Sequence, residues 1–172
     1  KNFALQLKSI IDKKIQVAIV IGGGNFWRGT SAAKNGIPRV RADYIGMLAT
    51  TMNALALQSG FEKNNVKCRV LNSLSMDERV CEKYINEKAI KYLNQGEIVI
   101  FAGGTGRAFF TTDTAATLFA SEIGAEAILM GKNNVDGVYD SDPKVNKEAK
   151  KFDRISYDEI LRRNLKVIDQ TA

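Results

Sequence analysis

The feature that most restricts the fold of this chain is a pair of apolar runs that end abruptly in glycine. Residues 16–21 (QVAIVI) run into the glycines at 22–24, and residues 97–102 (EIVIFA) run into Gly103 and Gly104. A short, nearly continuous apolar run is typical of a strand that is buried on both faces, as in a parallel sheet. Glycine at the end of such a strand leaves a bare backbone that another group can approach closely. Both runs therefore predict buried strands followed by exposed backbone loops.

Helical and strand patterns alternate at short intervals along the rest of the chain. Apolar spacing and the two capping-box pairs, Ser75 with Glu78 and Ser156 with Glu159, locate the helices. The helices are expected over residues 2–14, 43–63, 75–93, 112–123 and 157–164, and the strands over 16–21, 67–71, 97–102 and 127–130. This alternation predicts a three-layer α/β/α sandwich with a mainly parallel central sheet, built as a single domain over residues 1–172.

Composition excludes several classes of site. The chain contains no histidine, which rules out a histidine-based catalytic triad and a histidine metal site. Its two cysteines, Cys68 and Cys81, are too few for a zinc site or a disulfide framework, so we expect buried thiols and a reducing cytoplasm. No apolar run reaches the length of a membrane span. The net charge of +6 is scattered, and the basic segment 144–151 contains Glu148, which favours a solvated loop over a nucleic-acid surface.

The glycine loops are the first candidates for a functional site, because ligands bind beyond the carboxyl ends of the strands in such sheets. The loop at 22–29 lacks both the Walker A ending and the dinucleotide fingerprint. Its bare N–H groups are suited to an anion, and Arg28 adds a charge that matches phosphate. The alternative interpretation of the same residues is a tight glycine turn followed by a surface arginine.

The second glycine loop carries hydroxyl groups and a carboxylate in addition to its glycines. Thr105, Thr111 and Thr112 supply the hydroxyls, and Asp113 opens the next helix. Thr112 or Asp113 as a plain helix cap is the alternative interpretation, although a helix N-terminus also attracts phosphate. Two such loops at adjacent strand ends predict a site for two anionic ligands or for a transfer between them.

A third segment, residues 132–143, contains three aspartates but does not match the EF-hand pattern. It reads either as a surface hairpin or as a nucleotide-binding hairpin. In the second case, Lys132 and Tyr139 would meet a base or phosphates.

Taken together, five stretches resemble the bacterial UMP kinases of the amino-acid kinase family. They are, in order, IGGGNFWRG, RADYIGMLAT, FAGGTGRAFFTTDTAA, KNNVDGVYDSDP and LKVIDQTA, and the resemblance covers essentially all 172 residues. The resemblance implies transfer of the γ-phosphoryl group of ATP to UMP, with Mg²⁺, in the pyrimidine nucleotide biosynthesis of the cytoplasm. It also implies a homohexamer, in many members activated by GTP or inhibited by UTP, and no nucleic-acid or membrane partner.

The same resemblance implies roles for individual residues. Arg28, Asp113 and Asp142 would be catalytic, with Arg28 as the charge clamp and the two aspartates holding magnesium or orienting lysines. Asp169 matches a further active-site aspartate. The UMP side would comprise Gly23, Asp43 at the ribose, Thr105, Gly106, Arg107, Ala108, Phe109, Phe110, Thr111 and Thr112. The ATP side would comprise Gly24, Arg28, Asn133, Tyr139 and Asp142.

The chain also departs from the family pattern. It begins after a first strand that carries a Lys-Leu-Ser-Gly-like motif, and it ends before further strands, so we expect little or no activity from the chain as given. The UMP-binding part would span about residues 1–125 and a shortened ATP-binding part about 126–172. Arg107 and Ala108 stand where the family usually has Asn-Pro, which would alter contacts to UMP or to a neighbouring subunit.

Other interpretations remain open from the sequence. The first is another amino-acid kinase, of the acetylglutamate, carbamate or aspartate type. The second is a non-catalytic nucleotide-binding fragment, and the third is nucleic-acid binding. The apolar face of the helix at 43–63, marked by Tyr44, Met47, Leu48, Thr51, Met52 and Leu55, suits either the core or a subunit interface.

Overall fold

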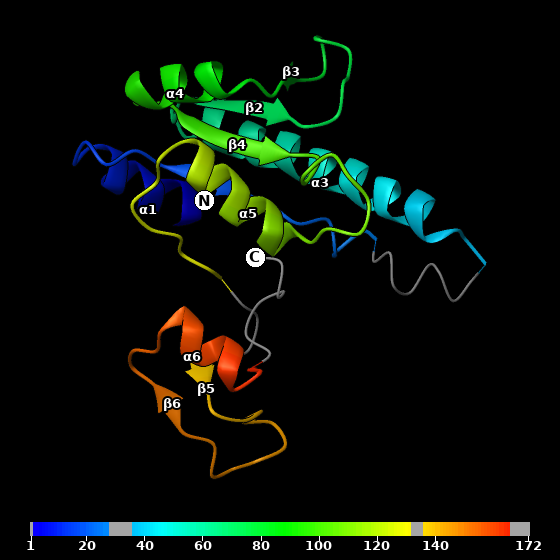
Figure 1. Ribbon diagram of the computed structural model, residues 1–172. Helices are drawn as coiled ribbons and strands as arrows, with labels where there is room; N and C mark the ends of the chain where they lie inside the picture. Colours follow the sequence, from blue (N-terminus) through cyan, green and yellow to red (C-terminus); the bar gives the residue numbers. More distant parts are fainter. Residues whose placement is uncertain (1, 28–35, 132–135, 166–172) are drawn as a thin grey trace.

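The computed structural model describes residues 2–27, 36–131 and 136–165 (Figure 1). Its main body is a four-stranded parallel sheet in the order β1-β4-β2-β3. The strands are β1 (Ala18–Val20), β2 (Cys68–Asn72), β3 (Glu82–Lys83) and β4 (Ile98–Ala102). The helices of this body are α1 (Asn2–Ile11), α3 (Arg39–Glu62), α4 (Asn86–Asn94) and α5 (Thr112–Glu122).

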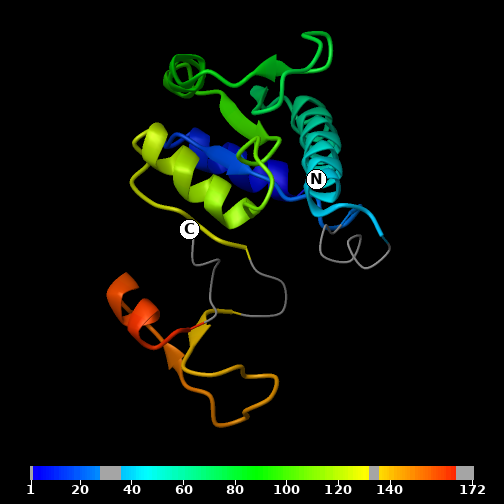
Figure 2. The same ribbon diagram turned by 45° about the vertical axis from the view of Figure 1, so that its right-hand side comes forward.

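Strand β4 forms the centre of the molecule, and all five of its residues are buried. Ile98, Ile100 and Ala102 pack on one face of the sheet in a cluster with residues of α1 and α3. Val99 and Phe101 point to the opposite face and pack with residues of α4 and α5. This alternation follows from the two-residue period of a strand. It confirms the three-layer α/β/α sandwich, and Figure 2 shows α3 and α5 on opposite sides of β4.

A smaller unit follows the sheet in the chain. Strands β5 (Val138–Tyr139) and β6 (Lys151–Phe152) pair antiparallel, and α6 (Tyr157–Arg162) follows them. Figure 1 shows these three elements apart from the four-stranded sheet. The predicted cap of α6 is confirmed, because the Ser156 side chain accepts a hydrogen bond from the Glu159 backbone N–H at 3.2 Å.

The predicted helix over residues 75–93 is wrong in its first half. The Asp77 carboxylate accepts the Arg79 backbone N–H at 2.9 Å and forms a turn in place of a first helical turn. The chain then runs beside β2 as β3, and the Tyr84 N–H donates to the Asn72 carbonyl at 2.8 Å. Helix α4 begins only at Asn86. The capping-box spacing of Ser75 and Glu78 therefore does not start a helix, because the chain that follows pairs with β2.

Two strand expectations are also corrected. Residues 127–130 form no strand, and Leu129 is 93% exposed, because no strand in the described ranges pairs with this segment. Strand β1 is shorter than predicted, and its residues are exposed or half-buried rather than buried on both faces. Among the described strands β1 pairs only with β4, so it lies at the edge of this sheet.

Helix α3 begins at Arg39, four residues before its predicted start, and it buries only part of the predicted apolar face, including Met47 and Thr51. Tyr44, Leu48 and Met52 are 42%, 46% and 53% exposed. The buried residues of the helix are Ala42, Met47, Ala49, Thr50, Thr51, Ala54 and Phe61. Most of these side chains are small, which lets the helix backbone come close to the strand ends and their loops.

Candidate active site at the carboxyl ends of the strands

The first glycine loop is pressed against α3. A Cβ atom on Gly23 would lie 2.6 Å from the Gly46 carbonyl oxygen and 2.9 Å from the Ala49 Cβ, so only glycine fits there. The Gly23 carbonyl accepts the backbone N–H groups of Phe26 and Trp27, both at 3.0 Å. The tight turn is therefore present, and the neighbouring Gly24 is exposed beside it. The loop therefore forms a tight turn and also exposes Gly24 to solvent.

Two asparagines that the sequence interpretation missed fasten this loop. The Asn53 side-chain amide donates to the Gly22 carbonyl at 2.7 Å. The side-chain amides of Asn25 and Asn53 also bond each other reciprocally, at 3.1 and 2.7 Å. The sequence feature that could have indicated this contact is the polar Asn53, which lies one helical turn after the buried Thr50. A Cβ atom on Gly22 would lie 3.4 Å from the Thr112 hydroxyl, which places the loop at the start of α5.

The second glycine loop depends on left-handed backbone conformations. Gly103 has φ +79°, and a Cβ atom there would lie 2.3 Å from the Asn72 side-chain oxygen. Its N–H donates to the Thr50 hydroxyl at 2.8 Å. Ser73, which follows β2, donates its hydroxyl to the Gly104 carbonyl at 2.8 Å. The end of β2 and the middle of α3 thus fix the loop.

Asp43 meets the predicted UMP segment directly. The Asp43 carboxylate accepts the Phe109 N–H at 2.8 Å, and Phe109 holds a left-handed φ of +73° that is uncommon for a non-glycine residue. Arg39 donates to the same carboxylate at 2.8 Å, and its guanidinium lies 5.5 Å from the centre of the Phe109 ring. The structure therefore brings Asp43 and the loop at 105–110 together, as the sequence led us to expect.

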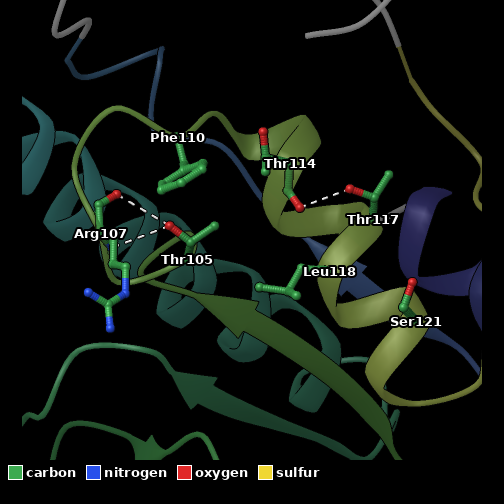
Figure 3. Close-up of a pocket in the computed structure, with 7 residues that line it drawn as sticks. All are labelled: Thr105, Arg107, Phe110, Thr114, Thr117, Leu118 and Ser121. Carbon is green, nitrogen blue, oxygen red and sulfur yellow. Dashed lines mark hydrogen bonds between the residues drawn. The ribbon is translucent and has the colours of Figure 1, made fainter. Parts of the chain in front are cut away.

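A pocket of about 480 Å³ lies between this loop and α5 (Figure 3). Its lining residues are Thr105, Arg107, Phe110, Thr114, Thr117, Leu118 and Ser121. Figure 3 shows Leu118 pointing from α5 toward the loop that carries Thr105. The α5 side of the pocket was not predicted. Its signal was a set of hydroxyl side chains at helical spacing, Thr114, Thr117 and Ser121.

The N-terminus of α5 completes this region. Its N-cap is Thr111, whose side chain accepts the Thr114 N–H at 3.3 Å. The alternative in which Thr112 or Asp113 is the cap is therefore wrong. Asp113 lies in the first turn of the helix and is half-buried. Asp113 directly follows Thr112, whose hydroxyl lies close to Gly22 of the first glycine loop.

Two of the predicted ATP-side residues, Tyr139 and Asp142, lie in the smaller unit, and Gly24 lies in the first glycine loop. The Tyr139 hydroxyl donates to Asp136 at 2.7 Å, and Lys151 pairs with the same carboxylate at 3.0 Å. The hydrogen bond from Tyr139, reinforced by Lys151, lowers the pKa of Asp136, and it raises the pKa of Tyr139. Asp142 accepts the Lys144 N–H at 2.9 Å and shapes the turn after β5.

Strand β5, which carries Tyr139, lies apart from the four-stranded sheet (Figure 1). Arg28, Lys132, Asn133 and Asp169 lie outside the described residues. Within the described ranges, no three Cys, Asp or Glu side chains gather as a metal site. In the same ranges, no helix has the length and apolar character needed to cross a membrane.

Comparisons with known proteins agree with this geometry. The profile of the Amino acid kinase family matches residues 1–172. The uridylate kinase of Mycoplasmopsis synoviae is 71% identical over 99% of this chain, which covers 72% of that protein. The uridylate kinase of Mycoplasmopsis pulmonis is 69% identical over 100% of the chain, which covers 71% of it.

Solved structures give the same result. The UMP kinase of Ureaplasma parvum superposes with a TM-score of 0.92 at 41% identity, over 98% of this chain and 71% of that one. The UMP kinase of Bacillus anthracis superposes with a TM-score of 0.93 at 44% identity, over 98% of this chain and 69% of that one. The chain therefore belongs to the amino acid kinase family, and within it to the uridylate kinases.

Proposed function

We propose that this chain binds UMP at the carboxyl ends of β1 and β4 and takes part in transferring the γ-phosphoryl group of ATP to it. The observation that carries the proposal is the convergence of both glycine loops on one stretch of α3 beside the N-terminus of α5. Gly23 packs against the backbone of Gly46 and Thr50, and the Gly103 N–H bonds the Thr50 hydroxyl. A glycine-lined backbone beside a helix N-terminus is a setting that attracts phosphate.

The nucleoside of UMP has a matching place next to these loops. Asp43 is a carboxylate at the mouth of the loop, and carboxylates accept hydrogen bonds from ribose hydroxyls. The neighbouring pocket combines apolar walls from Phe110 and Leu118 with the hydroxyl groups of Thr105 and Thr114. A flat heterocycle with polar edges fits this mixture. We assign the UMP-binding part to about residues 1–125.

The chemistry needs no general base. The second pKa of a phosphate monoester is about 6, so the acceptor oxygen of UMP is largely deprotonated at neutral pH. The absence of histidine from the chain is consistent with this mechanism. Catalysis then consists of holding two polyanions in line and offsetting their charge with backbone N–H groups and Arg28.

Magnesium would accompany ATP and neutralise charge on its phosphates. Mg²⁺ in such sites is held by one or two carboxylates together with substrate phosphates, so a cluster of three protein ligands is not required. The half-buried Asp113 in the first turn of α5 fits this role. Asp142 is the second candidate, although its carboxylate accepts the Lys144 N–H.

The ATP side is assigned to about residues 126–172, with Asn133, Tyr139 and Asp142, together with Gly24 and Arg28 of the first glycine loop. The remaining proposals follow from the family. They are a cytoplasmic location, a homohexamer, and GTP or UTP as effectors. The exposed stripe of Tyr44, Leu48 and Met52 on α3 is available for a contact between subunits.

Equilibrium binding and turnover test the proposal. Isothermal titration of the chain with UMP, and separately with Mg·ATP, should give a defined site for each ligand. A coupled assay with UMP, acetylglutamate and carbamate as acceptors identifies the substrate. Phosphorylation of acetylglutamate or carbamate without any of UMP would contradict the proposal. Binding of UMP without turnover would assign this chain a nucleotide-binding role.

A further inference from the structure

Two adjacent buried threonines in α3 have different partners. Thr50 and Thr51 are 5% and 3% exposed, and both donate their hydroxyl hydrogen to the Met47 carbonyl, at 2.7 and 3.3 Å. The Thr51 hydroxyl then accepts the Asn72 side-chain amide at 2.8 Å. The Thr50 hydroxyl accepts the Gly103 backbone N–H at 2.8 Å. Only Thr50 of the pair is bonded to a glycine loop.

Thr50 also touches the other glycine loop. A Cβ atom on Gly23 would lie 3.0 Å from the Thr50 backbone nitrogen, so the first loop rests on this turn of the helix. One turn further along α3, Asn53 holds the Gly22 carbonyl at 2.7 Å. A single helical turn thus bonds the loop after β1 on one side and the loop after β4 on the other.

The Gly103 N–H is buried, and the Thr50 hydroxyl is its acceptor in the structure. Its residue is held on the other side by contact with Asn72, whose side-chain oxygen would lie 2.3 Å from a Cβ atom. Loss of a partner for a buried N–H leaves the full desolvation cost of that group uncompensated. The Thr50 hydroxyl therefore constrains the start of the second loop more than a packing contact would.

We propose that Thr50 is a positioning residue that sets the distance between the two glycine loops and so prepares the UMP site. It acts through the backbone of Gly103 and has no contact with the substrate itself. This inference rests on the proposed function where it concerns UMP. The hydrogen bond to Gly103 and its effect on the loop are independent of the ligand.

Three variants separate this role from simple stabilisation of the core. Thr50→Val keeps the shape of the side chain and removes the acceptor, whereas Thr50→Ser keeps the hydroxyl. Thr51→Val makes the same chemical change one residue away. Amide hydrogen exchange of Gly103, followed by NMR, reports the loop directly, and urea denaturation supplies the global stability of each variant. Titration with UMP reports the consequence for binding.

We expect Gly103 to exchange about tenfold faster in Thr50→Val, beyond the effect of its global stability, and UMP to bind about tenfold more weakly. Thr50→Ser should restore both values, and Thr51→Val should accelerate Gly103 less than Thr50→Val does, because Thr51 reaches Gly103 only through Asn72. Equal acceleration in Thr50→Val and Thr51→Val would overturn the inference. So would an unprotected Gly103 in the wild-type chain, a result that requires no variant to fold.

The two proposals fail in different ways. If the wild-type chain does not bind UMP, the proposed function is wrong, and the exchange of Gly103 still decides whether Thr50 holds the loops. If the wild-type chain binds UMP and Thr50→Val binds it equally well, the proposed function stands and the positioning role of Thr50 is refuted.

Discussion

Replacement of Gly103 by alanine should be among the most damaging single-methyl changes in the molecule. Gly103 has φ +79°, a left-handed conformation that costs an L-residue with a Cβ about 1–2 kcal/mol. The new Cβ would also lie 2.3 Å from the Asn72 side-chain oxygen. Asn72 is fully buried and cannot swing away, because its side chain bonds Thr51 and the Leu74 N–H, both at 2.8 Å. Overpacking of this kind costs about 1–3 kcal/mol.

The two effects together lower the free energy of unfolding by about 2–5 kcal/mol. That is a large share of the stability of a typical domain, which is about 5–15 kcal/mol. Urea denaturation, followed by far-ultraviolet circular dichroism and by the fluorescence of the single tryptophan Trp27, measures the loss. Trp27 is a suitable reporter because its indole N–H bonds the Ala42 carbonyl at 2.9 Å, next to the first glycine loop.

Two glycines serve as matched controls. Gly96 has φ +75° with no atom within 4 Å of an added Cβ, so Gly96→Ala carries the backbone cost alone, about 1–2 kcal/mol. Gly60 lies in α3 with open space around it and no positive φ, so Gly60→Ala should stabilise the chain by about 0.5–1 kcal/mol. If Gly103→Ala lowers the free energy of unfolding no more than Gly96→Ala does, the steric conflict with Asn72 is refuted.

Three further predictions concern separate parts of the molecule. Asp43→Asn should weaken UMP binding about tenfold or more and leave ATP binding nearly unchanged, as measured by calorimetric titration of each nucleotide; equal weakening of both would remove Asp43 from the acceptor side. Burial, followed by the hydrogen bond to Glu122, raises the pKa of Tyr84 to about 12 from 10.0, so Tyr84 contributes stability that is fully present below pH 10 and lost as the pH rises toward 12. Denaturation curves should show a smaller loss between pH 10 and 12 in Tyr84→Phe than in the wild type, and identical pH profiles would refute the prediction. Burial raises the pKa of the Cys68 thiol to about 11, and Cys81 is buried, so Ellman's reagent at neutral pH should label neither cysteine until the chain is unfolded; rapid labelling of the native chain would show that these thiols are accessible.

The correct sequence predictions were those in which the local pattern and the final environment agree. The run at 97–102 is apolar at every position, and β4 is buried on both faces because helices cover both. Ser156 caps α6 because a cap bonds atoms only three residues away. Asp43 and the loop at 105–110 lie together through the Phe109 N–H, as the resemblance implies, and their role in UMP binding stays a prediction.

The wrong predictions were those in which a distant partner changed the outcome. Ser75 and Glu78 have the spacing of a capping box, yet the chain there turns at Asp77 and pairs with β2. Residues 127–130 have a strand-like composition but no neighbouring strand in the described ranges. For the apolar face of α3 the sequence left core and subunit interface open, and the structure leaves Tyr44, Leu48 and Met52 exposed. No short-range pattern contains this information, because each case depends on residues far away in the chain.

The sequence by itself determined the α/β class, the position of both glycine loops after strands, and the family with its phosphate chemistry. These properties are local, since a glycine after an apolar run and a threonine at a helix start act within a few residues. Only the tertiary structure decided that Gly23 must be glycine because of Gly46, and that Thr50 bonds Gly103 across 53 positions. The physical reason is that a site is defined by distances of about 3 Å between hydrogen-bonded atoms, and such distances arise only when the packed helix brings the two loops together.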